Sequence, residues 1–169
     1  QPFGAMTKST QGLAANRFKR ISSEQSAEYY PFDEQAKSHR YDFIANERSF
    51  AFMGDFQSLK QFYEAVPKLL IRRIINRQDR LDSCYCDEKL VFKKDINPFV
   101  VTTTAVSPKY LLGIINSRLI SYIYINTSAI ATKDDFRQTT LAELRRLPIP
   151  IQDSRASHDK LVALVDKML

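Results

Sequence analysis

The chain has 169 residues, 44% of them apolar, which is enough for one domain of ordinary size with a buried core. Lysine and arginine number 25 against 19 aspartate and glutamate residues, and the formal net charge of +6 favours anionic partners. No stretch approaches the roughly 18 consecutive apolar residues of a membrane span, and the N-terminus lacks the order of a secretory signal, so we expect a cytoplasmic protein.

The N-terminal third predicts little regular structure. Residues 1–16 are mostly small and polar, and we expect them to form a loose arm or an expression remnant. Segment 22–35 is typical of a loop, and a strand is expected at 49–53. From Asp55 to Pro67, apolar residues recur at helical spacing, which predicts a helix capped by Asp55 and ended by the proline.

The middle of the chain predicts a sheet followed by a buried helix. Four segments rich in β-branched and apolar residues are expected to be strands, at 69–75, 81–86, 89–93 and 99–104. Ser107 followed by Pro108 is a typical helix start. It predicts one central helix through residues 110–125, apolar on most sides, whose last turns could instead be strand.

The C-terminal part predicts two further helices. Thr140 and Glu143 have the spacing of a capping box for a short helix, and residues 147–150 must then be extended. Apolar residues from Leu161 onward mark an amphipathic helix. The expected fold is therefore α+β: a small mixed or antiparallel sheet packed with a buried central helix and an amphipathic C-terminal helix.

The sequence offers little support for catalysis or metal binding. A glycine-rich phosphate loop, a nucleophile elbow and paired histidine ligands are all missing. Residues 96–99, Ile-Asn-Pro-Phe, are similar to the Asn-Pro-Pro-aromatic motif of amino-methyltransferases, but one proline is lacking, and we expect a turn before a strand. Cys84 and Cys86 would share one face of a strand, which disfavours a disulfide, and His39 and His158 are too remote to complete a zinc site. We expect buried thiols and no metal.

Positive charge is concentrated at residues 67–80, where five basic residues and one acid give a local charge of +4. On a strand, Arg72 and Arg73 face opposite ways, so that one could reach DNA while the other pairs with an acid, although a solvated surface is an equally ordinary arrangement. The candidate DNA contacts are Lys68, Arg72, Arg73, Arg77, Arg80, Lys93, Lys94, Arg17, Lys19 and Tyr85. Arg20, Lys133 and Arg137 are weaker candidates.

Four segments carry a family resemblance. They are an entry segment at 11–18, the Pro-Lys-Leu-Leu-Ile-Arg-Arg-Ile segment at 67–74, the Leu-Leu-Gly-Ile-Ile-Asn-Ser segment at 111–117, and the Leu-Pro-Ile-Pro step at 147–150. Together they resemble the TaqI-like C-terminal specificity domain of type IIG restriction-modification enzymes and the related target-recognition domains of type I specificity subunits. The resemblance extends from about Gln11 to the end of the chain.

The resemblance implies a non-catalytic domain at 17–150 that recognises a sequence on duplex DNA, followed at 151–169 by the start of a spacer helix. It also implies a methyltransferase domain upstream in the intact protein, which uses S-adenosylmethionine to methylate the exocyclic amine of a flipped adenine. No cofactor is expected in this part of the protein. The alternative is a protein-interaction module that uses the apolar C-terminal helix and makes no direct DNA contact, and an enzyme is a more distant third.

Overall fold

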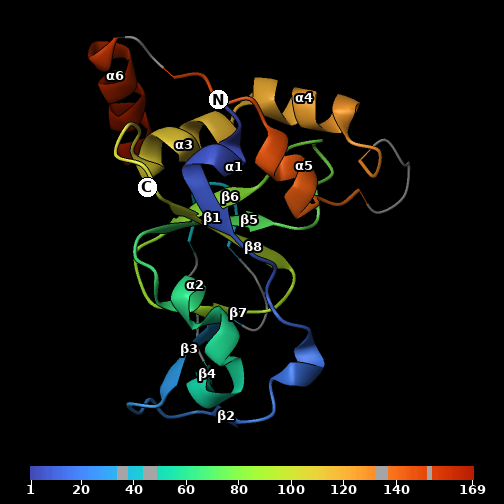
Figure 1. Ribbon diagram of the computed structural model, residues 1–169, viewed down its shortest axis with the longest axis vertical. Coiled ribbons are helices and arrows are strands. Elements are labelled where there is room, and N and C mark those ends of the chain that lie inside the picture. Colours follow the sequence, from blue (N-terminus) through green and yellow to red (C-terminus); the bar gives the residue numbers. More distant parts are fainter. Residues whose placement is uncertain (34–37, 44–48, 132–136, 152–153) are drawn as a thin grey trace.

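The computed structural model describes residues 1–33, 38–43, 49–131, 137–151 and 154–169, and its named strands form two four-stranded sheets (Figure 1). The first sheet is antiparallel, in the order β1 (Thr7–Ser9), β8 (Ile96–Val101), β5 (Lys68–Arg72) and β6 (Ser83–Cys86). The second is mixed, in the order β2 (Ile21–Ser22), β4 (Ser49–Phe52), β3 (Tyr29–Asp33) and β7 (Val91–Phe92), with β3 and β7 parallel. The expected α+β class is confirmed.

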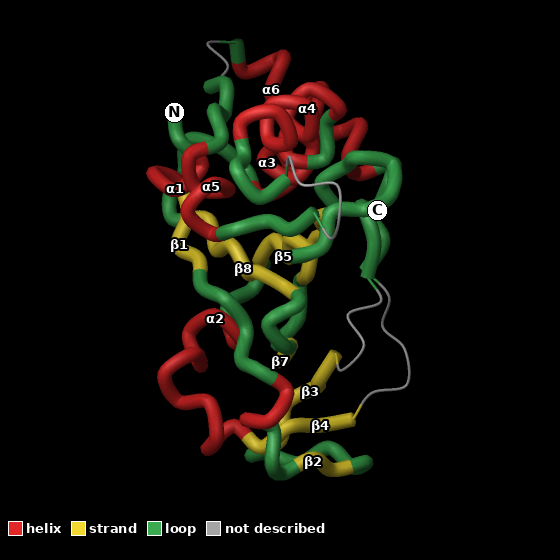
Figure 2. Tube along the Cα trace, turned by 90° about the vertical axis from the view of Figure 1, so that its right-hand side faces the viewer, coloured by secondary structure: helices red, strands yellow, loops and turns green. Residues whose placement is uncertain are grey.

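The helices divide between the two ends of an elongated molecule (Figures 1 and 2). Five lie at the end that holds the first sheet: α1 (Phe3–Met6), α3 (Pro108–Ile115), α4 (Arg118–Thr127), α5 (Leu141–Arg146) and α6 (Arg155–Asp166). The 3₁₀ segment η2 (Met53–Leu59) and helix α2 (Lys60–Glu64) lie with the second sheet, and a short 3₁₀ turn, η1 (Ala15–Arg17), precedes β2. No helix in these ranges is long and apolar enough to cross a membrane.

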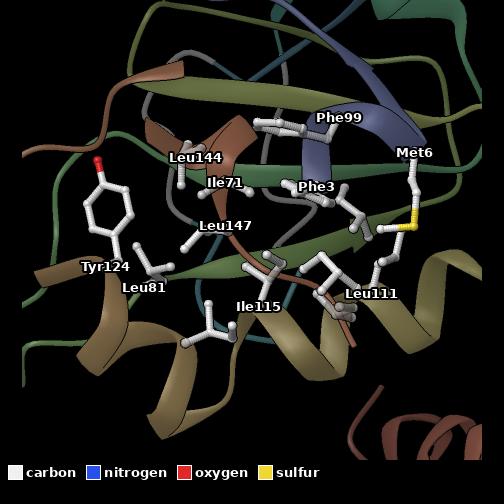
Figure 3. Packing of buried hydrophobic residues seen from close by; sticks show 14 of the residues in the cluster. Phe3, Met6, Ile71, Leu81, Phe99, Leu111, Ile115, Tyr124, Leu144 and Leu147 are labelled. Atoms are coloured by element: carbon white, nitrogen blue, oxygen red, sulfur yellow. The ribbon is translucent and has the colours of Figure 1, made fainter. Parts of the chain in front are cut away.

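Strand β5 is buried on both faces and separates two apolar clusters. Leu69 and Ile71 face the first core, which the first sheet shares with α1, α3, α4 and α5 (Figure 3). Leu70 faces the second core, together with Cys84 and Cys86 from β6. Burial on both faces explains why β5 reads as an unbroken apolar run and not as an alternating one. Both thiols are free, as expected.

The first nine residues are not a loose arm, and that expectation is wrong. Phe3 is fully buried in the first core and stacks on Phe99, with ring centroids 4.6 Å apart. Strand β1 then pairs with β8, with Thr7 opposite Val101. Polar composition suggested an arm, but Phe3 and Met6 bury enough apolar surface to fix this segment, because each buried large side chain contributes about 1.5–3 kcal/mol.

The single central helix predicted for residues 110–125 is two helices. The predicted start is confirmed, since Ser107 Oγ accepts a hydrogen bond from Tyr110 N and Pro108 occupies the first turn. The helix ends at Asn116, whose side chain bonds to the backbone of Ser83 in β6. Ser117 caps the next helix by accepting from Ile120 N. The Asn-Ser pair is therefore a break between α3 and α4.

Two other segments, expected in a loop and a turn, lie in strands. Residues 29–33, expected in a loop, form β3. Asn97 and Pro98, expected in a turn, lie inside β8, with Pro98 opposite Leu70 of β5. Strand β1 ends at Ser9 opposite Phe99, so Pro98 lies past the end of that pairing, where a sheet tolerates a residue without an N–H group.

Four local predictions are confirmed. The strand expected at 49–53 is β4, and the helix expected before Pro67 is η2 followed by α2, although Asp55 pairs with Arg20 instead of capping it. Thr140 Oγ1 caps α5 by accepting from Glu143 N. The C-terminal helix is α6, which packs on α3 at Gly113, where a Cβ atom would lie 3.0 Å from a Val165 methyl carbon.

Candidate nucleic-acid interface

Four segments that are far apart in sequence meet beside the end of β5, and we call them the basic loop face. They are residues 13–17, 73–79, 93–95 and 137–139. Backbone hydrogen bonds join them in a row: Lys94 N to Leu13 O, 2.9 Å; Arg73 N to Asp95 O, 2.8 Å; and Thr139 N to Arg73 O, 2.7 Å. All four lie on the right-hand side of Figure 1, which faces the viewer in Figure 2.

The basic loop face carries a net charge of +4, because its segments hold six basic residues and two acids. One of the acids, Asp79, is already paired with Arg137. Within the described ranges, no hydrogen bond or ion pair engages the side chains of the other five basic residues, which are Arg17, Arg73, Arg77, Lys93 and Lys94. Unpaired cations on adjacent loops suit contacts with phosphate groups.

Five of the ten predicted DNA contacts therefore gather on one surface. The other five lie elsewhere. Lys19 is exposed near Asp55, at the far end of the molecule, and Tyr85 is half-buried on β6 beneath Lys109, whose Nζ lies 5.5 Å from the ring centroid. Of the weaker candidates, Arg137 lies on the face, Arg20 is paired with Asp55, and Lys133 lies outside the described residues.

The prediction that Lys68 contacts DNA is wrong, because the residue has no exposed surface. Its side chain points into the second core from β5, and its Nζ donates hydrogen bonds to three backbone carbonyl groups: Tyr63 O at 3.1 Å, Ala65 O at 2.9 Å and Glu88 O at 2.7 Å. Burial lowers the pKa of Lys68. Its role is to join β5 to the end of α2 and to the loop after β6.

Arg72 and Arg73 have different surroundings. Arg72, the last residue of β5, donates from Nη1 to Ser38 O at 3.1 Å. It also lies near the carboxylate of Asp82, whose pKa is raised by burial while Arg72 acts to lower it. Arg73 follows the strand and is half-buried on the basic loop face. The structure thus places Arg72 near an acid and Arg73 on the basic loop face.

Asn97, Phe99 and His158, which entered the catalytic and metal hypotheses, are buried in the fold. Asn97 is 2% exposed and Phe99 is fully buried against Phe3, so this fragment cannot receive a base. His158 is buried, stacks on Tyr110 and accepts from Ser107 N, which fastens α6 to the start of α3. Among the described residues, no group of three or more His, Cys, Asp or Glu side chains could hold a metal ion.

A family model, the TaqI-like C-terminal specificity domain, matches residues 15–149. The chain belongs to this family. It is also 43% identical over 154 residues to a putative type II restriction enzyme and methyltransferase of Methanocaldococcus jannaschii. That alignment covers 89% of this chain but only 13% of the relative's length. The family resemblance read from the sequence is therefore confirmed, and the chain is a specificity domain of the restriction-modification type.

Two solved structures share the fold. One is a structure of a type I restriction-modification system described in terms of complex assembly and conformational transition, with a TM-score of 0.61 at 15% identity. The other is the HsdS subunit of Thermoanaerobacter tengcongensis, with a TM-score of 0.56 at 12% identity. Each match covers 99% of this chain and 37% or 36% of the other. At these identities the likeness is one of fold.

Proposed function

We propose that this domain recognises a specific sequence on duplex DNA through the basic loop face. The observation that carries the proposal is the convergence of five unpaired basic side chains, from three of the four segments, on one side of a specificity domain. Phosphate contacts from these residues would fix the position of the duplex, and polar groups on the same loops would read base edges.

We further propose that the chemistry belongs to another domain of the intact protein, which transfers a methyl group from S-adenosylmethionine to the N6 amine of an adenine. Support comes from the relative described as a restriction enzyme and methyltransferase, of which this chain spans a small part. The residues present do not fit the cofactor, because the chain has four glycines in all and its Asn97-Pro98-Phe99 fragment is buried in β8. The domain's part is to place the target base for that transfer.

Salt-dependent binding tests the DNA proposal. The double variant Arg73→Ala/Lys94→Ala should weaken binding to a 30-bp duplex. The negative slope of log K against log salt should become shallower by about 1.8, at about 0.9 per lost phosphate contact. The matched control Lys8→Ala/Lys160→Ala removes two exposed lysines from β1 and α6 and should leave the slope unchanged. Equal slopes for the two double variants would contradict the proposal.

Two further measurements address specificity and catalysis. Selection from a pool of randomised duplexes should enrich one sequence, and an unenriched pool would refute sequence recognition. The chain alone, incubated with duplex and labelled S-adenosylmethionine, should produce no methylated adenine. Methyl transfer by the chain alone would refute the assignment of catalysis to another domain.

A further inference from the structure

A pocket of about 680 Å³ lies next to the basic loop face, near the start of β6. It is lined by residues from two loops and from the end of the chain: His39, Arg40, Tyr41, Asn76, Gln78, Asp82 and Met168. The loop at residues 38–43 is held against the sheet because Tyr41 N donates to Ser83 O at 2.9 Å. The turn at 76–80 borders the pocket on one side and the basic loop face on the other.

Arg40 lines this pocket, and Arg80 and Arg118 lie nearby, beside the pocket. Burial lowers the pKa of Arg80, and the nearby charges of Arg40 and Arg118 lower it further. Such crowding is unfavourable unless an anion lies between the groups. In the described ranges, none of the three arginines has a carboxylate within ion-pair distance. A nearby acid is Asp82, whose Oδ2 lies 3.9 Å from His39 Nδ1. The charges of Arg72 and Arg40 also act on its carboxylate.

Several buried polar atoms at the same place have no hydrogen-bond partner. The Nε atoms of Arg40 and Arg80 are buried without a hydrogen-bond partner, and so are two nearby acceptors, Asp82 Oδ1 and Ser83 Oγ. Buried polar atoms are nearly always bonded, so an unpartnered donor points to a missing acceptor. Guanidinium N–H groups are the donors with which arginine binds the oxygens of a phosphate.

The arginine beneath the pocket is fixed before any ligand arrives. Arg80 Nη2 donates to Asn116 O at 2.5 Å, and Arg80 N donates to Asn76 Oδ1 at 3.1 Å. Asn116 is itself held by the backbone of Ser83, and its place at the break between two helices brings Arg118, the first residue of α4, to the same region. A fixed set of donors loses little conformational entropy on binding, which favours affinity.

We propose that Arg40, at the pocket, forms with the neighbouring Arg80 and Arg118 a phosphate-binding site that takes a backbone phosphate of the duplex bound on the adjoining basic loop face. This inference rests on the proposed function, since it assigns the phosphate to DNA. The pocket anchors one strand at a fixed distance from the loops, and its contact is independent of base sequence. Asp82 opposes binding, because it lines the pocket and its carboxylate lies near Arg40.

Two probes test the pocket, duplex DNA and inorganic phosphate. In the 169-residue chain, Arg40→Gln and Arg118→Gln should each make the negative salt slope for a 30-bp duplex shallower by about 0.9. Each should also abolish the rise in melting temperature that phosphate produces over chloride at equal ionic strength. Asp82→Asn should have the opposite effect and tighten both interactions. Lys8→Gln, on the opposite edge of the first sheet, is the matched control and should change neither.

The outcomes separate this inference from the proposed function. If Arg40→Gln and Arg118→Gln bind duplex with the wild-type salt slope, the assignment of the pocket to a DNA phosphate is overturned. This holds even if phosphate no longer stabilises these variants, because the pocket would then take a phosphate from another source. If those variants are normal while Arg73→Ala/Lys94→Ala is weakened, DNA recognition stands and the pocket inference fails. If the wild-type chain binds no duplex at low salt, both fail.

Discussion

Replacing Asn116 by alanine should destabilise the fold by breaking the link between the α3–α4 junction and β6. Asn116 is 1% exposed; its Oδ1 accepts from Ser83 N at 3.0 Å and its Nδ2 donates to Ser83 O at 2.9 Å. In the variant, Ser83 O keeps the bond from Tyr41 N, but Ser83 N loses this partner inside the protein. A stranded buried N–H costs about 1–3 kcal/mol and the second lost bond about 1 kcal/mol, which together give about 2–4 kcal/mol.

The measurement is thermal and urea unfolding of the full chain. For a domain of this size, that loss lowers Tm by about 4–16 °C. Asn126→Ala is the matched control. Asn126 is exposed on α4 and its side chain donates to Tyr122 O one turn earlier, so the variant should change stability by less than about 0.5 kcal/mol. If the two variants unfold at the same midpoint, the side-chain link to Ser83 does not stabilise the fold as argued.

Two other predictions concern buried or hydrogen-bonded charges. Lys68→Met should destabilise the fold by about 1–3 kcal/mol because three carbonyl groups lose their donor. A folded sample should keep the wild-type salt slope for DNA binding. A shallower slope would show that Lys68 contacts DNA after all. Burial opposes ionisation of Glu143, but hydrogen bonds from Ser128, Thr140, Tyr124 and Ala129 lower its pKa. This depressed pKa stabilises the fold above the ordinary glutamate pKa, and the stabilisation is lost as pH falls through the folded value. The advantage of wild type over Glu143→Gln in urea midpoint should therefore shrink from about pH 7 to about pH 3, and a constant difference would contradict it.

The features of the fold that sequence predicted correctly have local causes. Ser107 with Pro108, and Thr140 with Glu143, act on backbone groups within one helical turn, so their spacing alone is informative. The break at Asn116 could not be found in this way, because its partner Ser83 is 33 residues away. Strand β1 could not be predicted locally either, because its partner β8 supplies both the backbone pairing and the apolar surface that order the N-terminus.

The candidate site shows a similar division. Charge counting identified the region around β5, but it could not tell which side chains point outward, and Lys68 shares its face of β5 with Leu70 in the second core. Arg40 and Arg118 were missed because neither lies in a basic run. They reach Arg80 through the pairing of residues 38–43 with the edge of β6 and through the helix break, both of which are tertiary features.

The turn at residues 76–80 is the physical connection between the two basic surfaces. Asn76 Oδ1 accepts from Gln78 N at 3.0 Å and from Arg80 N at 3.1 Å, and Asp79 adopts a left-handed conformation with φ of 56°. This fixed turn leaves Arg77 exposed on the basic loop face and holds Arg80 beside the pocket. A change at Asn76 would disturb both surfaces at once. The two surfaces can be tested separately only through residues that lie away from this turn, on the neighbouring loops and at the start of α4.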